Sequence, residues 1–241
     1  GQEIIGAGLP GNYHAELNAM MFTAPSKAIT YLNANNTGYD LTQDVLSHNY
    51  NDYMQRIDNN IPATVLSLGT VNTPALAESR YLFDQGAILN LNNLVNLKDG
   101  VQLKVNAYYL HDSQKQDYSQ RTTVFLPVDT VHYTETQHNQ YRPDIFHAEF
   151  TTNINRDNYY LNDAALIDAN RSAWNSMLNS NGSIVGQNLH DNALSFSNEF
   201  NLIKSLKSNY VIQAYSYFSH TTEPETRVIQ PNFNDTLFNR G

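Results

Sequence analysis

The spacing of turn-forming residues constrains this chain more than any other sequence feature. From Lys98 onward, clusters rich in Gly, Pro, Asn, Asp and Ser lie roughly 25–30 residues apart. They are Lys98-Asp99-Gly100, Pro127-Val128-Asp129, Arg156-Asp157-Asn158, Asn179-Ser180-Asn181-Gly182 and Lys207-Ser208-Asn209. Ordinary β-sandwiches show a turn about every 8–12 residues. The segments between these clusters are therefore predicted to be unusually long.

Between the turns, apolar and polar residues alternate with a period of two. The stretch 103–109 is apolar at its odd positions, and 146–154 is apolar at most of its even positions. The same alternation recurs over 13–21, 194–202 and 210–218. Successive side chains of a strand point to opposite faces, so each stretch has one apolar and one polar face. The pattern predicts an all-β protein built as an antiparallel meander.

Long strands with two unlike faces are typical of outer-membrane barrels. A strand of 20–25 residues rises roughly 65–80 Å, enough to cross a bilayer and continue into solvent. Barrel topology also requires the turns to alternate between two ends. One end is predicted to hold Lys98-Gly100, Arg156-Asn158 and Lys207-Asn209, and the other Pro127-Asp129, Asn179-Gly182 and the excursion 36–76. We therefore expect residues 1–241 to form one segment of a transmembrane β-barrel. A soluble β-sandwich or β-helix with bulged strands is the alternative.

Aromatic residues and low charge agree with a barrel wall. Aromatic side chains lie on the apolar side of their strands about ten residues from a short turn, at Tyr109, Phe146, Phe196 and Phe218. Tyr159, Tyr160 and Tyr210 lie beside the short turns and would form a second girdle. Charged residues make up only 15 % of the chain, as expected where a charge facing lipid costs about 2–4 kcal/mol at mid-bilayer. Lys104, His147, Glu149 and Glu199 would line a polar lumen.

Two segments are expected to interrupt the strand pattern: the excursion 36–76, and 168–192, which is rich in Asn and Ser around the sole tryptophan, Trp174. Within 36–76, Asp40 is placed to cap a helix with Gln43 at the third helical position. The apolar and aromatic residues that follow share one face at helical spacing: Leu46, Tyr50, Tyr53, Met54 and Ile57. We expect one short helix inside this long loop.

Composition excludes several function classes. The formal net charge is −9 and no basic run occurs, which argues against nucleic acid as a partner. The chain has no cysteine, so disulfides, thiolate metal sites and a cysteine nucleophile are excluded. The N-terminal residues contain no basic residue before Lys27 and no long apolar run, so no signal peptide is expected here.

Candidate catalytic and metal residues do not converge. His132 and His138 share one face of an extended strand, whereas Glu135 points to the other. His111 and Asp112 are adjacent and therefore diverge. A hydrolase pair at Glu149 and Glu199 would need these residues to be cross-strand neighbours about 5–9.5 Å apart. With no nucleophile elbow, phosphate loop or HExxH motif, we expect no catalysis, no metal and no cofactor.

Three stretches carry a family resemblance. Arg80-Tyr81-Leu82-Phe83, Leu91-Asn92-Asn93-Leu94 and the run 103–112 resemble the barrel of TonB-dependent outer-membrane receptors, and the likeness continues to about residue 220. The nearest type is the SusC-like nutrient importer with a carboxypeptidase-regulatory-like domain. The resemblance implies a barrel of roughly 22 strands with a plug domain. At ~10–12 residues per membrane crossing, this chain would supply about ten of them, as an excised segment.

The resemblance implies transport in the cell outer membrane. The expected partners are a nutrient such as a glycan or peptide, outer-membrane lipid, a surface lipoprotein and an energy-coupling protein, the last two reached through other parts of the receptor. Flat aromatic rings stack on sugars and peptides, so Tyr50, Tyr53 and Trp174 are the candidate ligand-binding residues. A soluble all-β ligand-binding or adhesive domain is the alternative function.

Overall fold

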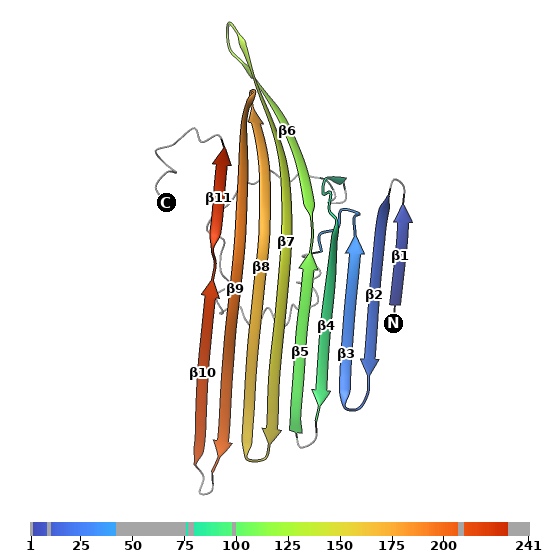
Figure 1. Ribbon diagram of the computed structural model, residues 1–241, viewed down its shortest axis with the longest axis vertical. Helices are drawn as coiled ribbons and strands as arrows, with labels where there is room; N and C mark the ends of the chain where they lie inside the picture. The colour runs from blue at the N-terminus through green and yellow to red at the C-terminus, as the bar shows by residue number, and fades with distance from the viewer. Residues whose placement is uncertain are drawn as a thin grey trace.

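The described part of the chain forms one antiparallel sheet. The computed structural model describes residues 2–8, 11–41, 76, 80–97, 100–206 and 210–230. Eleven strands lie side by side in a tall, open meander (Figure 1). The predicted all-β antiparallel class is confirmed, and a barrel segment is consistent with this sheet. The described residues include no helix long and apolar enough to span a membrane.

The strands follow the chain in order. They are β1 (Gln2–Gly8), β2 (Asn12–Phe22), β3 (Ser26–Asn35), β4 (Gly86–Asn96), β5 (Val101–His111), β6 (Gln114–Phe125), β7 (Thr130–Arg156), β8 (Tyr159–Ser180), β9 (Ser183–Ser205), β10 (Val211–Thr222) and β11 (Glu225–Gln230). The sheet order is β1-β2-β3-β4-β5-β7-β8-β9-β10. β6 continues β5 along the same edge of β7, and β11 continues β10 along β9.

Three central strands have the predicted length. β7 contains 27 residues, β8 contains 22 and β9 contains 23. At ~3.3 Å per residue, these strands rise about 70–90 Å. The segments 130–156, 159–180 and 183–205 are thus continuous strands, whereas 101–125 divides into β5 and β6, and 211–230 divides into β10 and β11.

Two prolines lie at interruptions of the sheet: Pro143 is opposite the break between β5 and β6, and Pro224 is within the break between β10 and β11. Pro143 belongs to the interior strand β7, and its carbonyl accepts a hydrogen bond from the Asp112 amide at 3.1 Å, between β5 and β6. The Pro224 carbonyl accepts one from the Asn192 amide at 3.2 Å, between β10 and β11. Proline cannot donate to the ladder, so it is tolerated beside such a break. Each proline, which lacks an N–H donor, therefore lies at a position where the hydrogen-bond ladder is already interrupted.

The turns alternate between the two ends as predicted. At one end, hereafter the short-turn end, lie the β2–β3, β4–β5, β7–β8 and β9–β10 connections. At the opposite end lie the β6–β7 turn, the β8–β9 turn and the long connection from β3 to β4. The helix expected around residues 40–57 falls almost entirely outside the described residues.

A small apolar cluster covers one part of the sheet. Tyr31, Ile88 and Leu110 are buried together with Leu41, which follows β3, and Ile145 packs against them. Leu41 lies over Gly86, where an added Cβ would come within 2.9 Å of the Leu41 Cδ1 atom and 2.7 Å of an Asp112 oxygen. Glycine is thus needed in β4 for the chain after β3 to approach the sheet.

Two glycine turns differ in how tightly they are enclosed. Gly182 forms the two-residue β8–β9 turn with Asn181, at φ values of +86° and +49°. A Cβ there would meet no atom within 4 Å. Gly100 also has a positive φ of +74°, but its added Cβ would come within 2.2 Å of the Asn155 carbonyl oxygen. Only Gly100 combines the conformational requirement with a backbone contact.

We predict that Gly100→Ala destabilises the protein more than Gly182→Ala. Both substitutions force alanine into a left-handed conformation, which costs about 1 kcal/mol. Gly100→Ala must also displace backbone of β7, so its total cost should reach about 3 kcal/mol or more. Urea unfolding followed by tryptophan fluorescence measures the two changes. Equal losses of stability would show that the approach of Gly100 to Asn155 is not a constraint.

Candidate functional site

The strand register separates two faces of unlike chemistry. One row across the sheet contains Tyr31, Asn90, Tyr108, His147, Asp168 and Ser195. The next row points to the other side and contains Leu32, Leu89, Tyr109, Phe146, Ala169 and Leu194. We call these the polar face and the apolar face. Lys104, His147, Glu149 and Glu199 share the polar face, as the alternation predicted.

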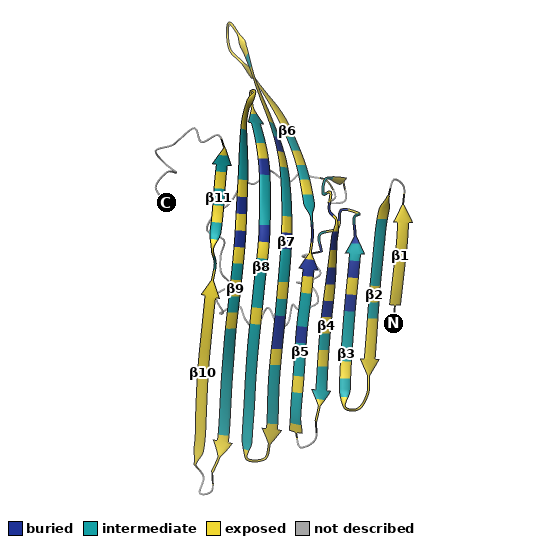
Figure 2. Cartoon of the chain, in the orientation of Figure 1, coloured by how far each residue is buried: buried dark blue, intermediate teal, exposed yellow. Residues whose placement is uncertain are grey.

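Burial is the reverse of what a sheet in water would show. The polar face holds side chains that are almost fully buried, including Asn35 at 1 %, Asn90 at 1 % and Glu149 at 6 % exposure. The apolar face leaves Phe150 57 % and Leu194 53 % exposed. Figure 2 shows buried positions alternating with exposed ones along β3, β4 and β9, whereas β10 is exposed throughout. Polar side chains are thus buried on one face, together with the apolar Ile88, Leu110 and Leu189, whereas many apolar side chains of the other face are exposed.

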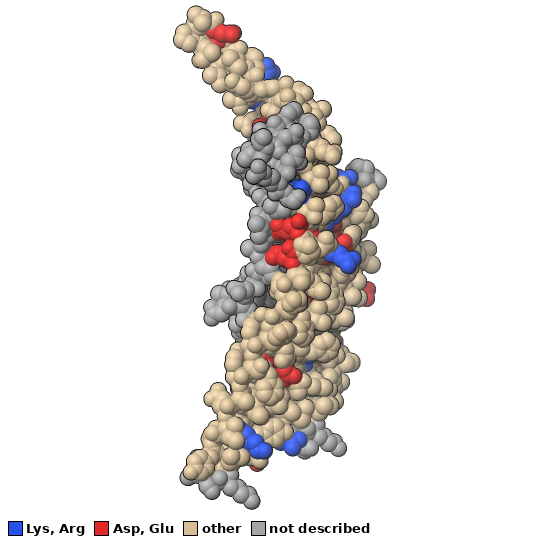
Figure 3. Space-filling view, turned by 60° about the vertical axis from the view of Figure 1, so that its left-hand side comes forward, with Lys and Arg blue, Asp and Glu red and all other residues tan. Residues whose placement is uncertain are grey.

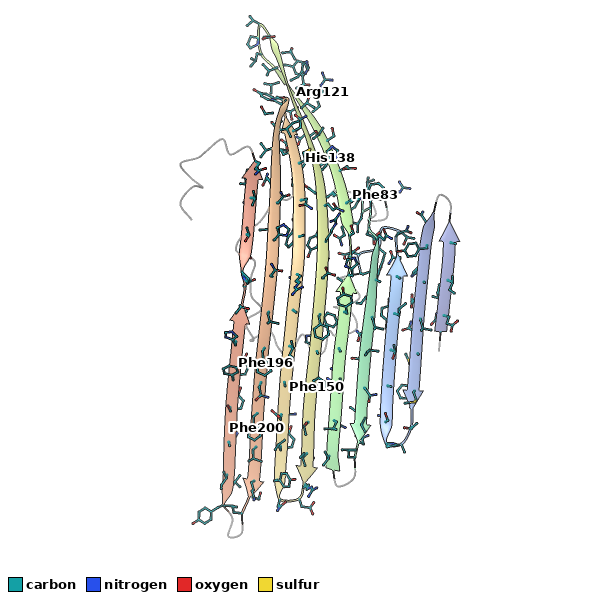
Figure 4. The ribbon with its side chains drawn as sticks, viewed as in Figure 1. Phe83, Arg121, His138, Phe150, Phe196 and Phe200 are labelled. Carbon is teal, nitrogen blue, oxygen red and sulfur yellow. The ribbon has the colours of Figure 1, made fainter. Side chains whose placement is uncertain are left out.

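The apolar face is a band with charged borders. On β7 the band runs from Phe146 to Ile154, a rise of about 26 Å along the strand. Its border at the short-turn end holds Arg156, whose guanidinium lies 5.6 Å from the centre of the Tyr159 ring. Its other border holds Asp144, which accepts a hydrogen bond from the Tyr109 hydroxyl at 2.9 Å. Figure 4 shows Phe150, Phe196 and Phe200 within this band, with His138 and Arg121 far beyond it.

A stacked pair dominates the centre of the polar face. The Tyr108 and His147 rings lie 5.0 Å apart at 17°. The His147 Nδ1 atom lies 2.5 Å from the Asp168 carboxylate, and its side chain is only 12 % exposed. Two polar side chains next to this pair also bind each other, since the Thr151 hydroxyl donates to Glu149 at 2.9 Å. His147 thus satisfies Asp168, and Thr151 satisfies Glu149, whereas the Nδ2 atom of Asn90, which pairs with Tyr108, is buried without a hydrogen-bond partner among the described residues.

Trp174 lies on the polar face, closer to the end opposite the short turns. It stacks on Tyr141 of β7, with ring centres 4.3 Å apart at 18°. One indole face is therefore occupied by protein, and the ring is held flat against its neighbour. Of the three predicted ligand-binding residues, Trp174 is placed by the structure, whereas Tyr50 and Tyr53 lie outside the described residues. The sequence analysis did not single out Tyr108 or Tyr141, although their strand parity matches that of the polar face.

The histidine and carboxylate pairs follow strand geometry. His138 contacts Asp117 of β6 at 2.6 Å, and His132 contacts Thr123, while Glu135 belongs to the opposite face. The predicted divergence of the two histidines from Glu135 is confirmed. Likewise His111 contacts Asp144 and turns away from Asp112.

Glu149 and Glu199 are not cross-strand neighbours, the arrangement that a hydrolase pair was said to need. β8 lies between β7 and β9, and Glu149 and Glu199 pair with Leu166 and Ala164 of that strand.

Carboxylates gather where the polar face meets the chain after β3. Asp84 accepts a hydrogen bond from the Gly38 amide at 2.7 Å, and Asp112 accepts one from the Gln114 amide group at 2.9 Å. Burial, with repulsion from neighbouring carboxylates, raises the pKa of both Asp84 and Asp112. The second oxygen of Asp84 is buried without a hydrogen-bond partner among the described residues. Protons or cations would therefore stabilise the buried carboxylates at this end of the polar face.

We predict that Asp84→Asn stabilises the protein near neutral pH by about 1 kcal/mol. Asparagine keeps the acceptor for Gly38 and removes a buried charge. Because the folded state raises the pKa of Asp84 above its ordinary value of 3.8, wild-type stability falls as pH rises from about 4 through the raised pKa. The two proteins should therefore converge at low pH. Urea unfolding at several pH values measures this, with Asp84→Ala as the control that loses the Gly38 bond.

No model of a known protein family matches the chain, and no curated protein matches it.

Proposed function

We propose that this chain is part of the outer-membrane barrel of a TonB-dependent receptor that imports large nutrients such as glycans, peptides or chelates, without catalysing a reaction. The inverted polarity of the sheet carries the proposal. Exposed Phe, Leu and Ile side chains on one face and buried Asn, Glu and Tyr on the other suit lipid outside and a polar lumen inside. A water-soluble sheet gains stability from the opposite arrangement.

The height of the apolar band supports a bilayer. Strands of such barrels tilt by ~35–45°, so the rise from Phe146 to Ile154 projects to about 20 Å along the membrane normal. The charged border rows, Asp144 and Arg156, lie 12 residues apart on β7 and project to about 30 Å. The apolar band of outer-membrane barrels is about 25 Å tall and falls between these two values. Each strand would then continue beyond the membrane.

Asp163 is an acidic residue on the apolar face, and its position along the strand agrees with the proposed height of the membrane. Asp163 of β8 pairs with Thr152 and lies toward the short-turn border rather than at the centre of the band. Its carboxylate accepts a hydrogen bond from the Asn198 amide at 2.8 Å. The cost of an acidic side chain facing lipid falls steeply toward the interface. Asp163 would therefore lie near the head groups, with Asn198 as its partner.

The polar face supplies the surface that a nutrient would contact. Its aromatic rings, Tyr108, Tyr141 and Trp174, offer stacking, and its amides and carboxylates offer hydrogen bonds. This chemistry suits sugars and peptides. In the proposed receptor, lipid contacts the apolar face, and the surface lipoprotein and energy-coupling protein contact other parts of the receptor.

Brominated lipids test which face meets the membrane. Two single-tryptophan variants, Phe150→Trp and Thr151→Trp, are each made with Trp174→Phe and folded into vesicles. Residues 150 and 151 lie at the same height on opposite faces, so they differ only in what their side chains meet. We predict strong quenching for the first and weak quenching for the second. Equal quenching, or monodisperse folding in plain buffer without vesicle binding, would favour a soluble ligand-binding or adhesive domain.

The role of Trp174 is tested separately by titrating soluble oligosaccharides and short peptides. For a compound that binds, we predict that Trp174→Ala weakens affinity about 10-fold, since loss of a stacked tryptophan typically costs more than 1 kcal/mol. Phe196→Ala on the apolar face is the matched control and should leave affinity unchanged. Calorimetry measures both. An unchanged affinity in Trp174→Ala would remove this residue from the binding surface.

A further inference from the structure

Three carboxylates meet where β10 gives way to β11. Asp191 of β9 pairs directly with Glu225, the first residue of β11. Glu223 lies two residues earlier, before Pro224. One oxygen from each of the three carboxylates lies within 4.8 Å of the others. In Figure 3, where the β10 and β11 side is turned forward, acidic atoms gather at mid-height.

Asp191 is the informative member of this group. It is only 1 % exposed, and neither carboxylate oxygen has a hydrogen-bond partner among the described residues. A buried carboxylate left without partners is costly, and like charges directly opposite each other on neighbouring strands add to the cost. Its oxygens nonetheless point at the two glutamates. The arrangement is therefore favourable only when these negative charges are neutralised, by a bound cation or by protons.

The nearest basic residue on the same side of β11 is turned to another partner. Arg227 pairs with Leu189 of β9, and its guanidinium donates to the Gln187 side chain at 2.7 Å. Burial first, and repulsion by Glu225, raises the pKa of Asp191, and burial together with both neighbours raises that of Glu223. Asp191 and Glu223 thus resist ionisation as long as no cation lies beside them.

We propose that Asp191, Glu223 and Glu225 bind one Ca²⁺ ion. Three carboxylates supply up to six oxygens, which suits the six to eight oxygen ligands of Ca²⁺, whereas Mg²⁺ usually keeps several waters and few carboxylates. The ion joins β9 to the break between β10 and β11. It thereby holds the edge of the sheet together where Pro224 interrupts the hydrogen-bond ladder. The site does not depend on the proposed transport function.

Trp174 gives this site a spectroscopic reporter. Ser172 pairs with Asp191 and Trp174 pairs with Leu189, so the indole and the Asp191 carboxylate are diagonal neighbours on one face. Terbium(III) occupies Ca²⁺ sites and emits when a nearby indole transfers energy to it. We expect terbium emission on selective excitation of Trp174, and its loss when Ca²⁺ is added. Trp174→Phe should abolish the emission and keep Ca²⁺ binding.

Calorimetry with Ca²⁺ decides the proposal. The chain is held in whichever medium keeps it monodisperse, micelles or buffer, so failure of the barrel proposal leaves this test intact. We expect one Ca²⁺ per chain in the wild type, at least a 10-fold weaker affinity in Asp191→Asn and Glu225→Gln, and unchanged affinity in Glu199→Gln, a carboxylate control on the same face of β9. Glu223→Gln serves if Asp191→Asn does not fold.

Protonation is the alternative to Ca²⁺ binding as the way in which the three carboxylates are neutralised. If the carboxylates are neutralised by protonation instead, the wild type binds no Ca²⁺, and acidification rather than Ca²⁺ raises its unfolding midpoint. That result overturns the proposal. Equal Ca²⁺ affinity in the wild type and Asp191→Asn overturns it as well, because the ion then binds elsewhere.

Discussion

The register of the antiparallel ladder is the constraint on which the rest of this structure depends. Side chains alternate strictly along a strand, so a slip of one residue between two strands would exchange their faces. From β3 to β9 the register holds without such a slip, and His147 therefore meets Tyr108 on one side and Asp168 on the other. The continuous apolar band, the polar face and the charged borders all follow from this single alignment.

The two breaks in the hydrogen-bond ladder are where carboxylates gather on the polar face. β5 stops and β6 starts beside Pro143, and β10 stops and β11 starts beside Pro224. Both breaks bring carboxylates to the polar face: Asp112 at the first, and Glu223 with Glu225 at the second. Backbone that leaves the ladder frees side chains from strict alternation. At the second break, Glu223 and Glu225 then lie beside Asp191 of the continuous strand β9.

Local pattern predicted most of the fold and little of the site. Alternation over 103–109 and 146–154 is a property of neighbouring residues, and the register confirms the two faces that it indicated. The stacking of Trp174 on Tyr141 and the meeting of Asp191 with Glu225 join distant parts of the chain, so they require the exact pairing of strands. For the same reason, sequence spacing alone does not show that β8 separates Glu149 from Glu199.

The two open edges of the sheet would affect how this chain inserts into a membrane. β1 and β10 each pair on one side only, which leaves rows of amide and carbonyl groups without protein partners in the described sheet. Water satisfies such groups readily, whereas lipid tails offer nothing, at several kcal/mol for each orphaned group. In the proposed barrel, both edges would therefore have to pair with further strands as the sheet enters the membrane.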